Sequence, residues 1–194
     1  IGAFQRLLDV SEDALKRDRA IFQTGESHSQ LGEQSAARSW YARLVDAYDF
    51  SALSEKELLE MKTQRLRGLV QETTRELVAK AQIRIADSYA AEGRTEEAIA
   101  AYSRVPVQFP QETLLVQKSY DNMATMVLER QGVDPGVRVL RQAIEQVDDP
   151  LFRGRVQLRI ASVLFRDGRF REAIAEYDVY ERAYGSIALS VGVG

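Results

Sequence analysis

The segment 80–110 contains two helical patterns separated by a turn, KAQIRIADSYAAEGRTEEAIAAYSRVPVQFP. Ile85 and Tyr89 mark one face of the first predicted helix, and Ala98 and Tyr102 mark one face of the second. Gly93 lies between the two patterns, while a proline at position 110 marks the expected end of the second helix. The pattern predicts a helical hairpin, and because two short helices cannot bury their apolar faces alone, such hairpins are expected to stack.

This hairpin resembles a tetratricopeptide repeat, a unit of roughly 34 residues with small and aromatic residues at fixed positions of its two helices. We set the small residue of the first helix, Ala86, at position 8 and count outward. The resulting units are 18–51, 79–112, the degenerate unit 117–150, and 154–187. Position 8 then holds Gly25, Ala86, Ala124 and Ala161, position 20 holds Ala37, Ala98, Gly136 and Ala173, and position 24 holds Tyr41, Tyr102, Leu140 and Tyr177. Small residues at positions 8 and 20 allow the two helices of a hairpin to approach closely.

The units depart from the family pattern at two positions. Position 4 carries Gln82, Tyr120 and Gln157 where a large apolar residue is usual, and position 11 of the first unit is His28. In the third unit, Asp134 and Pro135 are expected to supply the N-cap and a first-turn proline of the second helix.

Three longer segments lie outside the four units. Residues 1–17 are interpreted as a helix, either the second helix of a truncated repeat or a plain amphipathic helix packed on the first repeat. Residues 52–78 carry leucines at helical spacing and the capping box Ser54–Glu57. They predict a helical insertion: one long helix that continues into the next unit, which we favour, or a short helix, 54–67, folded back on the first unit. Residues 188–194 form a tail within the glycine-rich stretch 185–194, which is either the frayed start of a further segment or a short strand.

Together these patterns predict an all-α fold. The resemblance implies a right-handed α-α superhelix, a solenoid of helical hairpins with a long helical insertion. With 45% hydrophobic and 28% charged residues among 194, the composition is that of a globular protein. Because the chain starts with isoleucine rather than methionine, it is expected to be a fragment or a processed product, and its compartment is not predicted.

Several classes of function are disfavoured by composition and motifs. The net charge of -3 disfavours a general nucleic-acid binder. The chain has no cysteine, one histidine and no apolar run of the ~20 residues that span a bilayer. It contains no phosphate-binding loop, dinucleotide-binding glycine motif, GxSxG elbow or HExxH motif. We therefore predict neither an enzyme nor a cofactor or metal site, and interpret His28 as a half-buried packing residue.

In tetratricopeptide repeats the first helices line a concave groove through positions 2, 5, 6, 9, 12 and 13. Position 2 is basic in all four units, and position 6 is arginine in two. The resemblance implies a groove with apolar pockets and a basic rim, whose candidate partner-binding residues are Arg19, Phe22, Lys80, Ile83, Arg84, Asp87, Lys118, Asn122, Arg155, Leu158, Arg159 and Phe165. The alternative is that these basic side chains are simply solvated. The family's carboxylate clamp is missing, since only Asn122 matches it.

The expected function is a non-catalytic scaffold that binds a peptide or protein segment, with acidic segments among the candidates because arginine binds carboxylates bidentately. Two alternatives stay open. One is a structural subunit of a larger assembly, for which the chain's style resembles bacterial cell-envelope repeat proteins, with oligomers formed through the solenoid ends or residues 52–78. The other is a regulatory repeat domain of a longer chain. Charge reversal of Lys80 together with Arg84 is expected to weaken partner binding without unfolding the protein.

Overall fold

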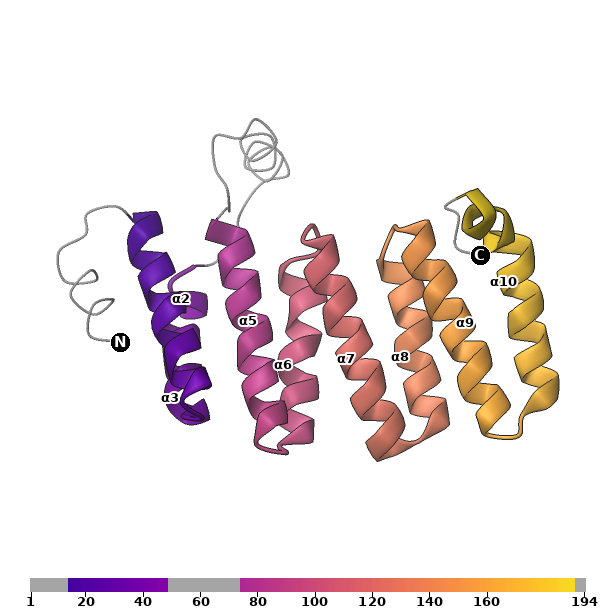
Figure 1. The fold of residues 1–194 in the computed structure, drawn as a ribbon, viewed down its shortest axis with the longest axis horizontal. Helices are drawn as coiled ribbons and strands as arrows, with labels where there is room; N and C mark the ends of the chain where they lie inside the picture. Colours follow the sequence, from indigo (N-terminus) through magenta and orange to yellow (C-terminus); the bar gives the residue numbers. More distant parts are fainter. Residues whose placement is uncertain (1–13, 49–73, 191–194) are drawn as a thin grey trace. The chain divides into compact units, whose positions relative to one another are not determined.

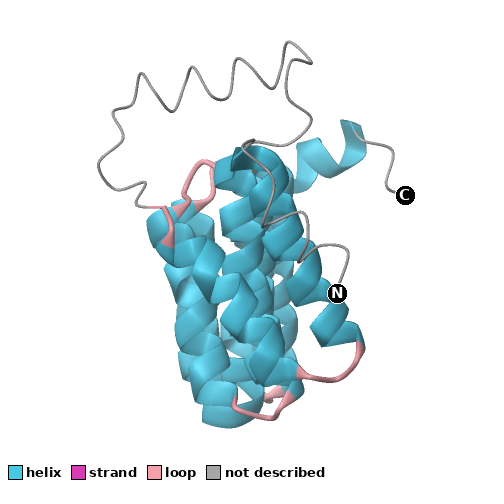
Figure 2. Cartoon of the chain, turned by 90° about the vertical axis from the view of Figure 1, so that its left-hand side faces the viewer, coloured by secondary structure: helices cyan, strands magenta, loops and turns pink. Residues whose placement is uncertain are grey.

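The computed structural model describes residues 14–48 and 74–190, and these residues form helices joined by short loops, with no strand among them (Figures 1 and 2). The helices are α2 (Ala14–Gln30), α3 (Gln34–Asp46), α5 (Thr74–Ala91), α6 (Thr95–Gln108), α7 (Thr113–Gln131), α8 (Val133–Gln146), α9 (Pro150–Arg166) and α10 (Phe170–Ser190). The prediction of an all-α fold built from helical hairpins is confirmed. The chain divides into two compact units, Ile1–Leu115 and Val116–Gly194.

The first unit contains two hairpins, α2–α3 and α5–α6, and α5 also packs on both helices of the preceding hairpin. Each hairpin turns at a glycine with positive φ, Gly32 at 77° and Gly93 at 72°. Glycine adopts this left-handed conformation without the steric cost that a Cβ would add. Backbone hydrogen bonds close both turns, including one of 2.9 Å from Arg94 to the carbonyl of Tyr89.

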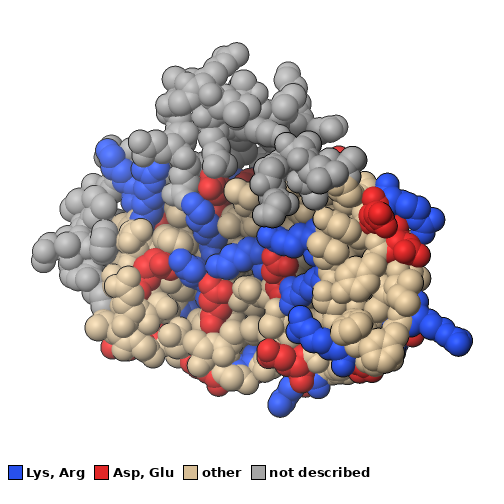
Figure 3. All heavy atoms as spheres, turned by 45° about the vertical axis from the view of Figure 1, so that its right-hand side comes forward, with Lys and Arg blue, Asp and Glu red and all other residues tan. Residues whose placement is uncertain are grey.

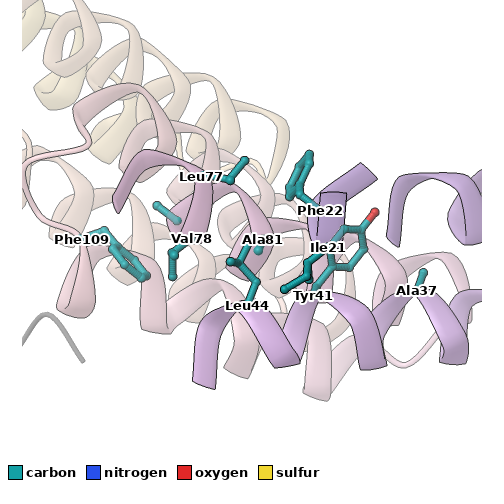
Figure 4. Close-up of a cluster of buried hydrophobic side chains, with 10 residues drawn as sticks. Ile21, Phe22, Ala37, Tyr41, Leu44, Leu77, Val78, Ala81 and Phe109 are labelled. Carbon is teal, nitrogen blue, oxygen red and sulfur yellow. The ribbon is translucent and has the colours of Figure 1, made fainter. Parts of the chain in front are cut away.

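The core of the first unit lies between α2, α3 and α5 (Figure 4). Tyr41 and Leu44 of α3 are buried together with Leu77 and Val78 of α5, and each of the four is at most 2% exposed. Close packing explains why position 8 of this hairpin is a glycine: a Cβ added to Gly25 would lie 2.5 Å from Cε1 of Tyr41. The hairpin closes only because α2 offers no side chain at that point.

The second unit contains α8, α9, α10 and most of α7. α9 packs against both α8 and α10. At position 20 of the third unit, a Cβ on Gly136 would lie 3.2 Å from the Cα of Leu128 and closer still to its side chain, so α7 and α8 also meet at a small residue. Asp149 caps α9, accepting hydrogen bonds from the backbone N–H groups of Leu151 at 2.9 Å and Phe152 at 3.1 Å. Such a cap satisfies donors that the first helical turn leaves without partners.

The glutamines at position 4 are accommodated by hydrogen bonds across the hairpin. Gln82 is 1% exposed and donates from Nε2 to the carbonyl of Ala101 on α6 at 2.9 Å. Gln157 is 5% exposed and donates to the carbonyl of Glu176 on α10 at 3.3 Å. A buried amide with a partner avoids the desolvation cost of an unsatisfied polar group.

Some expectations from the sequence are wrong or lie outside the described residues. The N-cap of α8 is Gly132 rather than Asp134, which lies in the first turn and forms an ion pair with Arg169 at 2.5 Å. Residues 185–190 continue α10 instead of forming a tail or strand, and 191–194 are not described. Residues 14–17 belong to α2 and residues 74–78 to α5, while the remainder of the predicted helix 1–17 and of the insertion 52–78 falls outside the described ranges.

Candidate binding surface

A polar network joins the two hairpins of the first unit. Glu26 on α2 accepts hydrogen bonds from Tyr41 Oη at 2.6 Å and from Arg84 Nε at 2.7 Å. Arg84 also donates to Asp87 at 3.1 Å, and Asp87 accepts a hydrogen bond from the hydroxyl of Tyr102. Arg84, at position 6 of its unit, is thus held by two carboxylates at position 9: Glu26 of the preceding unit and Asp87 of its own unit.

This network shifts the pKa of Arg84 and of Tyr41. Burial lowers the pKa of Arg84, but its hydrogen bonds to Glu26 and Asp87 and the attraction of these charges outweigh burial and raise that pKa. Burial raises the pKa of Tyr41 far above its ordinary value, and the hydrogen bond to Glu26 adds to this effect. Arg84 therefore stays charged and Tyr41 stays neutral, so the network is a fixed set of ion pairs and charge-assisted hydrogen bonds.

A second network in the other unit repeats this arrangement with different residues. Asp121 on α7 pairs with Arg155 at 2.9 Å and with Arg159 at 3.4 Å, both on α9. Arg159 also donates to Oγ1 of Thr125 at 2.7 Å. In both units, therefore, arginines of one first helix bind polar side chains of the first helix before it.

The predicted groove residues fall into groups with different environments. Phe22 and Ile83, predicted to line apolar pockets of a groove, are 8% and 2% exposed and belong to the core. The centroid of the Phe22 ring lies 5.6 Å from that of Tyr41. Leu158 is half-buried, whereas Phe165 is 54% exposed and contacts Phe170.

The basic residues of the predicted rim are partly neutralised by the chain itself. Lys80 pairs with Glu76 at 3.2 Å, and Arg84, Arg155 and Arg159 pair with the carboxylates described above. The remaining predicted residues are Arg19 and Asn122, which are half-buried, and Lys118, which is exposed. Figure 3 shows basic and acidic side chains lying next to one another on the surface. Reversing the charge of Arg84 would bring a third carboxylate to Glu26 and Asp87, so that change tests folding as much as binding.

A pocket of about 410 Å³ opens between α7 and α9 in the second unit. Its lining residues are Thr125, Leu128, Glu129, Val133, Arg159, Val163, Arg166 and Asp167. Only Arg159 was predicted as a site residue. Leu128 and Glu129 occupy positions 12 and 13 of the third unit, and Arg166 occupies position 13 of the fourth. These are groove positions of the family, so counting along the repeats could have identified these three residues.

The pocket is lined by both aliphatic and charged side chains. Leu128, Val133 and Val163 line it with aliphatic side chains, and two arginines and two carboxylates are also among its lining residues. Arg159 is held by Asp121 and Thr125, whereas Arg166 is exposed at the end of α9. Such a mixture suits an apolar side chain with a polar flank, as in most binding sites for organic groups.

Within residues 14–48 and 74–190, no three histidine, aspartate or glutamate side chains gather as ligands for a metal ion. None of the helices described here has the length and apolar character that crossing a membrane requires.

Comparisons with known proteins agree with the helical hairpins. Two family models described as tetratricopeptide repeat match residues 80–112 and 128–186. None of the curated proteins is a significant sequence match. Among solved structures, BtubC (BKLC) from P. vanneervenii is similar at 16% identity with a TM-score of 0.56, over 96% of this chain and 70% of that protein.

A second solved structure is the Rap conjugation gene regulator of plasmid pLS20 in complex with the Phr* peptide. It is 13% identical with a TM-score of 0.52, and the match covers 98% of this chain but only 47% of the regulator. At these identities both likenesses concern the fold alone.

Proposed function

Because the chain is a tetratricopeptide repeat protein, we propose that it is a non-catalytic scaffold that binds a peptide or protein segment on the surface formed by its first helices. The observation that carries this proposal is the pocket between α7 and α9, which lies on the first helices of two successive hairpins. The regulator of similar fold that was solved with a bound peptide supports the same class of function.

The pocket narrows the chemistry of the proposed ligand. An aliphatic or aromatic side chain fits the surface of Leu128, Val133 and Val163, and burying such a group is worth about 1.5–3 kcal/mol. A neighbouring carboxylate of the ligand would reach Arg166, whereas Arg159 is already held by Asp121 and Thr125. The expected ligand therefore carries one apolar side chain with an acidic group beside it, and it does not need to contact a long row of basic residues.

Selection of short random peptides displayed on phage, with the chain as the target, provides a direct test. Enriched peptides would be synthesised with a fluorophore and titrated by fluorescence anisotropy against the unmodified chain and three variants. Arg166→Glu and Val163→Asn change the pocket, while Arg104→Glu changes an exposed arginine of α6 outside it.

We expect each pocket variant to weaken binding by about tenfold, and Arg104→Glu to leave it unchanged. Enriched peptides should contain an apolar residue with an acidic residue close to it. Peptides whose affinity is the same for all four proteins, or a selection that enriches nothing, would refute the pocket as a binding site.

A further inference from the structure

Three arginines of α9 lie on one narrow face of the helix. Arg155, Arg159 and Arg166 follow the spacing i, i+4, i+11, which at 3.6 residues per turn places them within about 40° of one another around the helix axis. α9 contains no aspartate or glutamate, so every charged side chain of this helix is positive. Such a face can contact an acidic ligand at more than one point if the rest of the chain does not neutralise it.

The neighbouring helix α7 neutralises only part of this face. In the second unit, one carboxylate, Asp121, is shared by Arg155 at 2.9 Å and Arg159 at 3.4 Å. In the first unit the ratio is reversed, because two carboxylates pair with a single arginine, Arg84. Two arginines against one carboxylate leave a surplus of positive charge in the network of the second unit.

Arg155 is both oriented by the protein and accessible to a ligand. Its side chain is 62% exposed although it pairs with Asp121. Its guanidinium also lies over the ring of Phe152, 5.2 Å from the ring centroid, and Phe152 is 3% exposed. An arginine carries five N–H donors in a planar fork, and one donor of Arg155 binds Asp121. The ring and the carboxylate thus orient a guanidinium that has further donors for a second carboxylate.

Arg155 and Arg166 lie on either side of Val163 along α9, and Val163 lines the pocket. Eleven residues separate the two arginines, which corresponds to ~16 Å along a helix. In an extended peptide, residues four apart lie on the same side and about 13 Å from one another. The long side chains of glutamate and arginine cover the remaining difference.

We propose that Arg155 and Arg166 bind two acidic residues of one extended ligand segment, four residues apart, whose apolar side chain enters the pocket between them. This inference rests on the proposed function and narrows its ligand from one acidic residue to a pair at a fixed spacing. The carboxylate farther from the apolar side chain binds the donors of Arg155 that Asp121 does not use. Arg155 is therefore the residue that selects the spacing.

Four labelled peptides of nine residues, blocked at both ends, are the probes. In the first, glutamates at positions 3 and 7 flank a leucine at position 6, with serine and alanine elsewhere. The second has the same pattern in reverse order, because a ligand can run along α9 in either direction. Each spaced peptide has an isomer of the same composition in which both glutamates are adjacent and lie beside the leucine. Peptides this short do not form stable helices in water.

Binding of each peptide to the full chain and its variants is followed by fluorescence anisotropy. Arg155→Gln removes the charge of Arg155 and leaves Asp121 paired with Arg159. Arg138→Gln is the matched control, because Arg138 is an exposed arginine of α8 outside this face. In a further peptide, glutamine replaces the glutamate that is farther from the leucine.

We expect at least one spaced peptide to bind about fivefold more tightly than its isomer, and Arg155→Gln to abolish this difference. Arg155→Gln should leave the affinity for the isomer within twofold, and Arg138→Gln should preserve the preference. The glutamine peptide should lose as much affinity as Arg155→Gln causes, and the two changes together should cost no more than either alone. High salt should reduce the preference, because exposed charges are screened.

Equal affinity of the spaced peptides and their isomers overturns the proposal, as does the absence of binding by every peptide. An Arg155→Gln variant that weakens spaced and adjacent peptides equally also overturns it, because that result is a general effect of charge. If circular dichroism shows that Arg155→Gln is unfolded, the glutamine peptide decides, since it leaves the protein unmodified. If Val163→Asn weakens binding while the spacing has no effect, the pocket is supported and only the role of Arg155 is refuted.

Discussion

Replacement of Gly25 by alanine tests the close packing on which the first hairpin depends. Gly25 is buried on α2, and an added Cβ would lie 2.5, 2.8 and 2.9 Å from Cε1, Cδ1 and Cζ of Tyr41. The tyrosine has little room to move, because it is 1% exposed, packs on Phe22 and donates a 2.6 Å hydrogen bond to Glu26. The ring must therefore shift against its neighbours or the helices must separate.

The expected cost is the balance of two destabilising effects and one stabilising effect. Overpacking a buried site costs typically 1–3 kcal/mol. Loss of the tyrosine hydrogen bond adds about 1 kcal/mol if the ring moves. The better helix propensity of alanine returns about 1 kcal/mol. We expect Gly25→Ala to lower the free energy of unfolding by about 2 kcal/mol.

Urea unfolding, followed by the fluorescence of Trp40, measures this change. Trp40 is the single tryptophan of the chain and packs against the core of the first unit, so its signal reports on that unit. Gly185→Ala is the matched control, because its Cβ would meet only Cγ of Glu181 at 3.9 Å. Because Gly185 lies in the other unit, the control should leave the transition that Trp40 reports unchanged. If Gly25→Ala is as stable as the unmodified protein, the close contact between α2 and Tyr41 is refuted.

Three further changes test other parts of the account. Asp149→Ala removes the cap of α9 and should lower the free energy of unfolding by about 1–2 kcal/mol in urea titrations. Asp149→Asn should cost less, because the amide oxygen can still accept the two hydrogen bonds. Equal losses for the two variants would contradict the role of Asp149 as a cap. Burial and the hydrogen bond to Asp18 raise the pKa of Tyr48 to about 12. The stability that Tyr48 confers is therefore complete below the ordinary pKa near 10 and is lost as the pH rises toward 12. In an absorbance titration at alkaline pH, Tyr48→Phe should lose the component near pH 12, and an unchanged titration would contradict the raised pKa. Arg84→Met should lower the free energy of unfolding by about 1–2 kcal/mol, after allowance for the partial exposure of Arg84. A double-mutant cycle with Glu26→Gln should show coupling between the two residues. Additive effects would show that the ion pair does not link the two hairpins.

Residue size and spacing predicted the hairpins well. Gly93 lies in the turn between α5 and α6, and Ala86 and Ala98 are fully buried at the positions expected to be small. The candidate site was predicted less well, because position within a repeat does not say whether a side chain reaches solvent. Phe22 lies on a first helix as expected, yet it is buried against Tyr41.

For the predicted basic rim, position within a repeat likewise does not say whether a charge is already paired. The sequence shows Arg84 and Arg159 as cations. Besides the nearby Asp87, Arg84 binds Glu26, which lies 58 residues away in the chain, and Arg159 binds Asp121, which lies 38 residues away. Counting along the repeats placed these arginines on the first helices. It did not reveal that the preceding first helix would neutralise them.

By itself, the sequence determined that this protein forms helical hairpins, because glycine, alanine and tyrosine at regular spacing specify local helices and turns through short-range sterics and periodic burial. Only the tertiary structure decided which polar and apolar side chains remain available. Pairing of Arg84 with Glu26, burial of Phe22 and exposure of Ile174 all depend on which helix lies alongside, and that neighbour is distant in sequence.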